Sequence, residues 1–282
     1  MRVLVTGNRP TAGSWAIRAE QLARPAGFRV EPLTTDIRDA QVVVAVKRHN
    51  AELPSICRRA GIPLVWDIID PWPQPIGNLW DEQTSKAWLY AELKRIRPRL
   101  VLASTKRMAE DIKTLGFDAA CIYHHARSAK PRQAAEKVRV VGYDGSPVQL
   151  GHWADIVRSQ CAKRGWEFVT DGARYHEFDI VLGLRSHAGY APRNWKSNVK
   201  LANAQAAGIP FIGSPEAGYL ETRVPGCEKF ATDESSLSQA FDALTPMESR
   251  ARISAWMQAV AHVASVENIR RQYVGAIGSV LS

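Results

Sequence analysis

Residues 196–221 carry the sequence KSNVKLANAQAAGIPFIGSPEAGYLE. Small and apolar residues recur at helical spacing over 197–207, and a Gly-Ile-Pro turn then leads into a short apolar run at 209–212. The side chains of Lys196 and Ser197 stand at the start of the predicted helix. Because free backbone N–H groups and the helix dipole favour negative charge there, the stretch predicts a phosphate-binding helix followed by a buried strand.

The same alternation of helix and strand extends in both directions from this stretch. Short runs rich in Val, Ile and Leu alternate with segments of helical period, which is typical of βα units that build a parallel sheet. In the first half we expect strands at 2–6, 42–46, 63–69, 100–103 and 119–123, with helices at 14–24, 51–60, 78–95 and 105–115. In the second half we expect strands at 138–142, 167–169, 179–182, 209–212 and 228–231, with helices at 149–164, 197–207, 235–244, 247–263 and 265–280.

A polar segment at 128–137 separates these two series. It contains Pro131 and lacks an apolar period, so it is predicted to be an interdomain linker. The fold class expected from this organisation is α/β, with two Rossmann-like domains that face a cleft. We place the first domain at 1–130 and the second at 138–264, followed by a C-terminal helix at 265–282.

The composition limits the class of protein. The 282 residues are 45% hydrophobic, enough for a substantial core, and no apolar run approaches the roughly 20 residues that span a bilayer. The N-terminus opens as a strand without a signal-peptide pattern, which predicts a cytoplasmic protein. The cysteines form no CxxC pair, so we expect four reduced thiols and no metal site; they are Cys57, Cys121, Cys161 and Cys227.

The positive charge is concentrated in the first half of the chain. The formal net charge is +9. Residues 1–137 hold 22 Lys and Arg against 14 Asp and Glu, a net of +8, which leaves 15 against 14, a net of +1, for the remainder. This asymmetry favours an anionic partner for the first domain, either nucleic acid or an acidic membrane surface, although a solvated basic surface explains the composition equally well.

Several motifs together resemble one family. Residues 196–221 are similar to the donor-binding helix and following strand of GT-B glycosyltransferases of the family 1 and family 4 type. The opening VTGNRPTAGSWAIRAEQLA resembles their N-terminal glycine loop and helix, and VRVVGYDGSP resembles the first strand and loop of their second domain. The tail SVENIRRQYVGAIGSVLS resembles the final helix, which crosses back onto the first domain. Trp195 and Asn203 stand where many retaining members have two glutamates, so those sugar and ribose contacts do not carry over.

The resemblance implies a nucleotide-sugar donor bound by the second domain, with a UDP-sugar favoured. Lys196 and Lys200, four residues apart on one predicted helix face, are candidate diphosphate ligands together with Ser197, and Arg185 follows a buried strand as a further cation. Glu216 is placed to accept hydrogen bonds from ribose or sugar hydroxyls.

Two glycine-containing loops complete the predicted donor site. Gly142 allows close backbone approach and Tyr143 offers a ring for base stacking, although a tight turn accounts for that glycine as well. Gly13 and Ser14 precede the first helix, and their amides are expected to face the donor phosphate or the acceptor.

Candidate catalytic residues follow strands of the first domain. Asp70 ends the apolar run PLVWDIID and is the favoured general base for an inverting transfer, with Asp67 as the other carboxylate; a retaining transfer needs no such base. His49 is the other predicted base, with His124 as its alternative. Trp72 and Trp80 flank a proline-rich loop and are candidates for acceptor stacking.

The acceptor is open at this stage. The basic first domain favours an anionic acceptor, and DNA that carries a hydroxymethylated base fits, as in phage-type DNA glycosyltransferases, with Arg9, Lys47 and Arg48 on the DNA phosphates. A cell-surface glycan or lipid-linked acceptor fits nearly as well. A two-domain protein that binds ligand without catalysis is the rival class. No metal is expected, because cations and a helix end meet the diphosphate charge.

A DNA acceptor predicts a steep salt dependence. If three cations neutralise DNA phosphates, affinity should fall roughly 40-fold between 50 and 200 mM salt, because the slope of log K against log[salt] is about −0.9 per contact. Fluorescence anisotropy with a labelled duplex over this range measures the slope. No retention of DNA at low salt would exclude the DNA acceptor.

Overall fold

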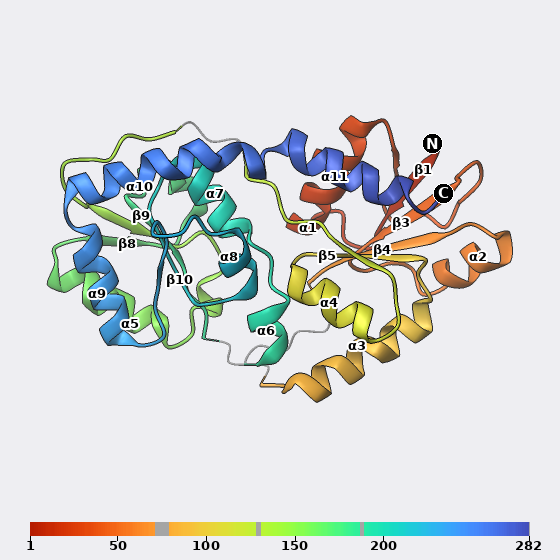
Figure 1. The fold of residues 1–282 in the computed structure, drawn as a ribbon, viewed down its shortest axis with the longest axis horizontal. Coiled ribbons are helices and arrows are strands. Elements are labelled where there is room, and N and C mark those ends of the chain that lie inside the picture. Colours follow the sequence, from red (N-terminus) through yellow and green to blue (C-terminus); the bar gives the residue numbers. More distant parts are fainter. Residues whose placement is uncertain (71–78, 128–130, 187–188, 282) are drawn as a thin grey trace.

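The computed structural model describes residues 1–70, 79–127, 131–186 and 189–281, which form two α/β lobes side by side (Figure 1). The N-terminal lobe holds a six-stranded sheet in the order β2-β1-β3-β4-β5-β6, and the C-terminal lobe a five-stranded sheet in the order β11-β10-β9-β7-β8. Every strand pair is parallel. These sheets confirm the predicted α/β fold with two Rossmann-like domains.

The strands of the N-terminal lobe are β1 (Val3–Thr6), β2 (Arg29–Val30), β3 (Val42–Val46), β4 (Leu64–Ile69), β5 (Leu100–Ala103) and β6 (Ala119–Cys121). Its helices are α1 (Gly13–Trp15), which continues as a π-helical segment (Ala16–Ala23), α2 (Leu53–Ala60), α3 (Glu82–Ile96) and α4 (Lys106–Thr114). All the strands predicted here form. The two-residue β2 was missed because an edge strand of this length has no detectable period.

The strands of the C-terminal lobe are β7 (Val140–Gly142), β8 (Glu167–Val169), β9 (Ile180–Gly183), β10 (Phe211–Gly213) and β11 (Lys229–Phe230). Its helices are α5 (Trp153–Lys163), α6 (Tyr190–Asn194), α7 (Val199–Ala207), α8 (Ala217–Thr222), α9 (Glu234–Leu244) and α10 (Met247–Val260), and the last helix of the chain is α11 (Val266–Gly278). The short α6 and α8 were not predicted.

One predicted boundary changes the interpretation of the site. Helix α7 begins at Val199, with Asn198 as its N-cap, and not at residue 197. Lys196 therefore precedes the helix, and the prediction that Lys196 and Lys200 share one helix face is wrong. Tertiary contacts, and not the i, i+4 spacing, decide where the two ammonium groups lie.

Both sheets reverse their strand order at one equivalent point. The reversal falls between β1 and β3 in one lobe and between β7 and β9 in the other. Ligands of open parallel sheets bind beyond the carboxyl ends of the strands at such a point. Residues that follow β1, β3, β7 and β9 are thus the first to examine for function.

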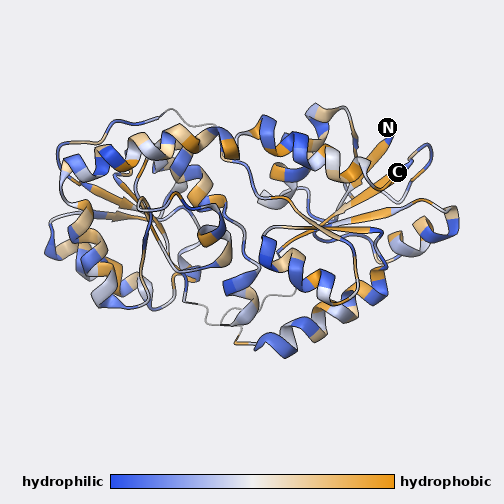
Figure 2. Ribbon diagram, in the orientation of Figure 1, coloured by the Kyte–Doolittle hydropathy of each residue, from blue (hydrophilic) through white to orange (hydrophobic). Residues whose placement is uncertain are grey.

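Apolar residues concentrate in the strands of both lobes, as Figure 2 shows. Strands β1, β3, β4, β5 and β9 are buried along their whole length, as expected for sheets covered by helices on both faces. The four cysteines are free thiols, and three of them, Cys57, Cys161 and Cys227, are buried. Within the described residues, no helix is long and apolar enough to span a bilayer.

Helix α11 returns to the N-terminal lobe (Figure 1). Its side chains Ile269, Tyr273 and Ile277 are buried in the same cluster as Val5, Leu22 and other residues of that lobe. The crossing helix predicted from the tail is therefore confirmed.

A second segment crosses between the lobes in a way that the sequence did not predict. Ala191 of α6 and Trp195, which follows it, are buried in the core of the N-terminal lobe. The Trp195 indole N–H donates to Asp111 of α4 at 2.8 Å, and its backbone carbonyl accepts from Ser104 at 2.9 Å. Trp195 is a packing and hydrogen-bonding residue here.

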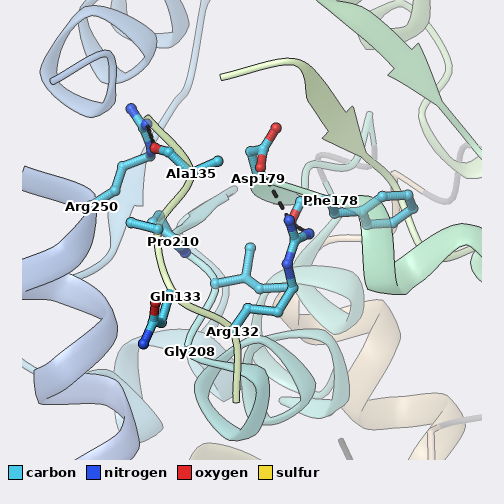
Figure 3. Close-up of a pocket in the computed structure, with 10 residues that line it drawn as sticks. Arg132, Gln133, Ala135, Phe178, Asp179, Gly208, Pro210 and Arg250 are labelled. Atoms are coloured by element: carbon cyan, nitrogen blue, oxygen red, sulfur yellow. Dashed lines mark hydrogen bonds and ion pairs between the residues drawn. The ribbon is translucent and has the colours of Figure 1, made fainter. Parts of the chain in front are cut away.

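The described part of the predicted linker is docked on the C-terminal lobe. Arg132 donates to the carbonyl of Phe178 at 2.6 Å and pairs with Asp179, while Arg250 donates to the carbonyl of Ala135 at 2.6 Å (Figure 3). The space enclosed there is only about 10 Å³, too small for a ligand. Residues 128–130 of that linker lie outside the described residues.

Replacing Trp195 with Ala should destabilise the protein by about 3–5 kcal/mol, the usual loss for a buried tryptophan. Equilibrium denaturation measures the change. Trp256→Ala is the matched control, because that side chain is 49% exposed and its loss should cost about 0.5 kcal/mol. Equal effects of the two substitutions would contradict the role of Trp195 in the N-terminal core.

Candidate functional site

The two lobes meet at a carboxylate that lies between two lysines. Asp70, just after β4, has its Oδ2 atom 3.2 Å from Nζ of Lys47, which follows β3. The same oxygen lies 3.7 Å from Nζ of Lys196, which belongs to the C-terminal lobe. All three side chains are largely buried, so the ion pairs are only weakly screened by solvent. Asp70 thus joins the carboxyl ends of the two sheets.

This arrangement keeps Asp70 ionised. Burial raises the pKa of its carboxyl, but the charges of Lys196 and Lys47 more than offset that effect and hold the pKa below its usual range. Burial in turn lowers the pKa of Lys196. A carboxylate with a lowered pKa is a weak general base at neutral pH, so this environment favours charge pairing over the proton transfer predicted for Asp70.

The backbone is strained at Ile69, which precedes Asp70, and at Lys47, which pairs with it. Lys47 has a φ of 55° and Ile69 a φ of 58°. Positive φ is a genuine outlier for a β-branched residue such as isoleucine, and such strain gathers at functional sites. The backbone N–H of Lys47 donates to the carbonyl of Asp67 in β4 at 2.8 Å, which fixes the residue after β3 to the neighbouring strand.

In the C-terminal lobe, Arg185 and Glu216 form a buried ion pair. Nε of Arg185 lies 2.9 and 3.0 Å from the two carboxylate oxygens of Glu216, and the side chains are 11% and 4% exposed. They line a cavity of about 360 Å³, here named the Arg185 cavity, together with His152, Trp153, Ser186 and Ser214. The cavity lies beyond β9 and β10, at the edge of the sheet where ligands bind.

Lys200 lies beside the loop that follows β7. Its Nζ atom is 4.5 Å from the ring centroid of Tyr143 and donates to the carbonyl of Asp144. Burial, and then the charge of Arg185, lower the pKa of Lys200 to about 8. Gly145 leaves room for this ammonium group, because a Cβ atom at this residue would lie 2.5 Å from Nζ of Lys200 and would displace it.

The second half of the site therefore holds an excess of buried positive charge. Arg185 lowers the pKa of both Lys196 and Lys200, which means that the three cations repel one another. Glu216 and Asp70 offset only part of this charge. A ligand with two negative groups would relieve the repulsion, and phosphate oxygens match both guanidinium and ammonium donors.

The first half of the site has a smaller basic pocket, here named the Arg9 pocket. Arg9, Ser14, Trp15, Lys47 and Arg48 line about 80 Å³ between the carboxyl ends of β1 and β3. The backbone N–H of Asn8 donates to the carbonyl of Arg48 at 2.7 Å and joins the two loops. Burial and the nearby charge of Arg9 lower the pKa of Arg48. The structure thus brings together the three cations that the sequence assigned to an anionic partner.

Other predicted residues have a structural explanation. A Cβ atom on Gly142 would lie 2.0 Å from the ring of Phe178, so packing accounts for this glycine. Tyr143 is 1% exposed beneath Lys200 and offers no free face for a base. Gly13 is exposed with open space around it, and Ser197 is buried beside the N-cap of α7.

The predicted bases lie in different surroundings. His49 bonds through Nδ1 to the carbonyl of Asn50, and the charges acting on it come from Arg95 and Glu92 of α3. His124 instead feels the charges of Arg18, Asp70 and Lys47. The structure therefore places His124, and not His49, beside Asp70. Trp72 lies outside the described residues, and Trp80 bonds through its carbonyl to the backbone of Tyr190.

His124 is the residue that sequence reasoning undervalued. Its side chain is buried, and neither ring nitrogen has a hydrogen-bond partner within the described residues. Burial lowers its pKa well below the usual value, so the ring is neutral at pH 7. Its backbone N–H donates to the side chain of Asn198 at 3.0 Å, which ties it to the start of α7. A neutral imidazole with two unused nitrogens is able to bind hydroxyl groups or transfer a proton.

The buried ion pair of Arg18 and Asp67 holds the two residues that precede His124. Arg18 lies 3.3 Å from Asp67, both fully buried, and donates to the carbonyls of Ile122 and Tyr123 at the end of β6. Burial raises the pKa of Asp67 to about 6, an effect that Arg18 only partly offsets. Asp67 is therefore enclosed by its partners and is not a cleft carboxylate. Within the described ranges, no three His, Cys, Asp or Glu side chains are grouped to hold a metal ion.

Several solved structures that this chain resembles are glycosyltransferases. The lipopolysaccharide outer core galactosyltransferase WaaB, in its apo form, matches with a TM-score of 0.61 and 12% identity, over 99% of each chain. A glycosyltransferase from Rickettsia africae matches with a TM-score of 0.62 and 11% identity, over 100% of this chain and 99% of that one. These likenesses show that the chain has the GT-B fold.

A trehalose-6-phosphate protein from E. coli, solved with UDP-2-fluoro glucose, also matches, with a TM-score of 0.61 and 12% identity over 98% of this chain and 99% of that one. No protein-family model matches the sequence, and no curated protein matches it either. The fold is therefore established by structural comparison alone.

The lowered pKa of Lys200 predicts a pH-dependent stability. Between pH 8 and 10.5 the unfolded chain binds more protons at this residue than the folded protein, so its contribution to stability rises with pH by roughly 3 kcal/mol. Lys200→Met should be most stable relative to wild type near pH 7, and this difference should shrink toward pH 10. Urea denaturation across this range measures it, with the exposed Lys163→Met as control. A difference independent of pH would contradict the buried charge.

Proposed function

We propose that this protein is a glycosyltransferase that binds a nucleotide-sugar in its C-terminal lobe and an anionic acceptor in its N-terminal lobe. The observation that carries the proposal is the group of buried cations Arg185, Lys196 and Lys200 at the strand-order reversal of a GT-B fold. The structural neighbours support it, since the E. coli protein was solved with a UDP-sugar analogue. UDP is accordingly the first nucleotide to test.

In the proposed reaction an acceptor oxygen forms a bond to the anomeric carbon of the sugar, and the bond from that carbon to the diphosphate oxygen breaks. The leaving nucleoside diphosphate gains negative charge. Arg185, Lys196 and Lys200 are preorganised to stabilise this charge, because Glu216, Asp70 and the Asp144 carbonyl already fix their positions. The same cations supply the charge that a metal ion provides in other transferases, so we propose a metal-independent reaction.

His124 is proposed to contact the transferred sugar or the acceptor hydroxyl. It lies between Asp70 and the start of α7, and its ring nitrogens have no partner within the described residues. For an inverting transfer His124 is the alternative base to Asp70, because its ring nitrogens have no partner within the described residues, whereas Asp70 is paired with two lysines. For a retaining transfer the same ring would only bind a hydroxyl group.

The Arg9 pocket supports an anionic acceptor. Its lining brings Arg9, Lys47 and Arg48 together, and phosphate oxygens match guanidinium and ammonium donors. DNA with a hydroxymethylated base remains the acceptor that we propose to test first. The small volume of the pocket also suits one phosphate of a cell-surface glycan precursor or lipid-linked acceptor. We also propose a cytoplasmic location, as the sequence predicts.

Lys196→Ala should weaken UDP binding by about 1.5–3 kcal/mol, the usual loss for a charge-assisted hydrogen bond. Isothermal titration calorimetry measures the change, and Lys113→Ala, an exposed lysine of α4, is the control. Unchanged affinity in the Lys196 variant would remove this residue from the donor site. Release of UDP from a UDP-sugar that persists in EDTA would support metal independence, whereas a ligand-binding protein should release none.

The acceptor test needs residues that leave the donor site intact. Lys47 pairs with Asp70, so reversing the charge of Lys47 would disturb the ion pairs of Asp70. Arg9→Ala with Arg48→Ala should therefore reduce acceptor binding while UDP affinity stays within about 0.5 kcal/mol of wild type. A loss of UDP binding in that double variant would place the donor, and not the acceptor, in the Arg9 pocket.

A further inference from the structure

A second large cavity lies at the junction of the two lobes, apart from the Arg185 cavity. It has a volume of about 450 Å³, is lined by residues of α8, of the turn after α10 and of α11, and is here named the junction cavity. One wall is apolar and consists of Val224, Pro225, Val260, Val263, Ala264 and Ile269. Val263 is 54% exposed, so apolar surface is open at the rim. The size is within the range of small-molecule sites.

The same lining also contains polar residues and two cations. Lys106 and Arg223 line the cavity, both are exposed, and neither forms a salt bridge within the described residues. The one carboxylate in the lining is Glu221. It accepts from the backbone N–H groups of Lys106 and Arg107 at 2.7 and 2.9 Å and from the Tyr123 hydroxyl at 2.9 Å. The start of helix α4 thus partly balances the charge of Glu221, and the charge of Arg223 also acts on Glu228 nearby, so the lining of two cations and one carboxylate keeps a net positive charge.

We propose that the junction cavity binds an amphipathic anion, a small molecule with an apolar tail and a carboxylate or phosphate group. The tail would lie on the wall that includes Val224 and Val260, and the anionic group would pair with Lys106 and Arg223. An apolar tail alone would leave the cations unused, and a compact polar anion would leave the apolar wall in water. A ligand with both an apolar tail and an anionic group would contact the apolar residues and the two cations together.

Such a ligand would touch both lobes at once. Lys106 and Ile269 belong to the core and helices of the N-terminal lobe, whereas Val224 and Val260 belong to the C-terminal lobe. Asn198 also lines the cavity, and its side chain accepts the backbone N–H of His124. The cavity therefore adjoins the proposed active site without sharing a residue with the Arg185 cavity.

Calorimetric titration of the full chain with octanoate, octyl phosphate and 1-octanol tests the proposal. The two anions should bind at least tenfold more tightly than the alcohol, a ratio that corresponds to about 1.4 kcal/mol. The ratio of octanoate to octyl phosphate affinity tells whether a carboxylate or a phosphate is preferred. Lys106→Ala with Arg223→Ala should abolish the preference for anions, and Lys113→Ala with Arg139→Ala, exposed cations outside the cavity, should retain it.

A substitution in the apolar wall tests the contact with the ligand's tail. Val263→Glu should weaken all three ligands, whereas Val148→Glu, at a residue 58% exposed elsewhere, should not. Saturating UDP should not displace the anions, so a failed donor assignment leaves this test unaffected. Equal affinity for octanol and octanoate, displacement by UDP, or no binding of any of the three would overturn the proposal.

Discussion

The Asp70 carboxylate, placed between Lys47 of one lobe and Lys196 of the other, is the interaction on which the site depends. Opposite charges this close and this buried attract strongly, and their geometry is set by strained backbone at Lys47 and Ile69. Removing one partner would leave a buried charge without compensation, which is far more destabilising than the pair is stabilising. The carboxylate therefore links the two lobes at the carboxyl ends of their sheets.

Three further contacts join the two lobes. Helix α11 packs on the N-terminal lobe through Tyr273, and Trp195 fills the N-terminal core from the opposite direction. Glu221 of α8 bonds to the first backbone N–H groups of α4. The hydrogen bonds of Trp195 and Glu221 join residues at least 84 positions apart in the chain. Relative movement of the lobes would have to break several of them together.

Both halves of the site hold more positive than negative charge, and the protein carries this charge at a cost to its stability. Lys200 and Lys196 lose solvation, and Arg48 lies beside Arg9. Sites that bind charged ligands often keep such arrangements, because the ligand supplies the missing charge. The neutral ring of His124, without partners within the described residues, fits the same account: its polar atoms are satisfied when a ligand is present.

The sequence by itself determined the two lobes, nearly all the strands and the crossing helix, because apolar periodicity and turn residues act over a few positions. It also identified Lys196, Lys200, Arg185 and Glu216 as a group. Only the tertiary structure decided how they are arranged, since Arg185 pairs with Glu216 and Lys196 with Asp70 across gaps that no local pattern encodes. The burial of Trp195 in the other lobe, the enclosure of Tyr143 under Lys200 and the isolation of the His124 ring also depend on long-range packing. A residue's pKa and accessibility are set by neighbours from distant parts of the chain, which a single sequence does not reveal.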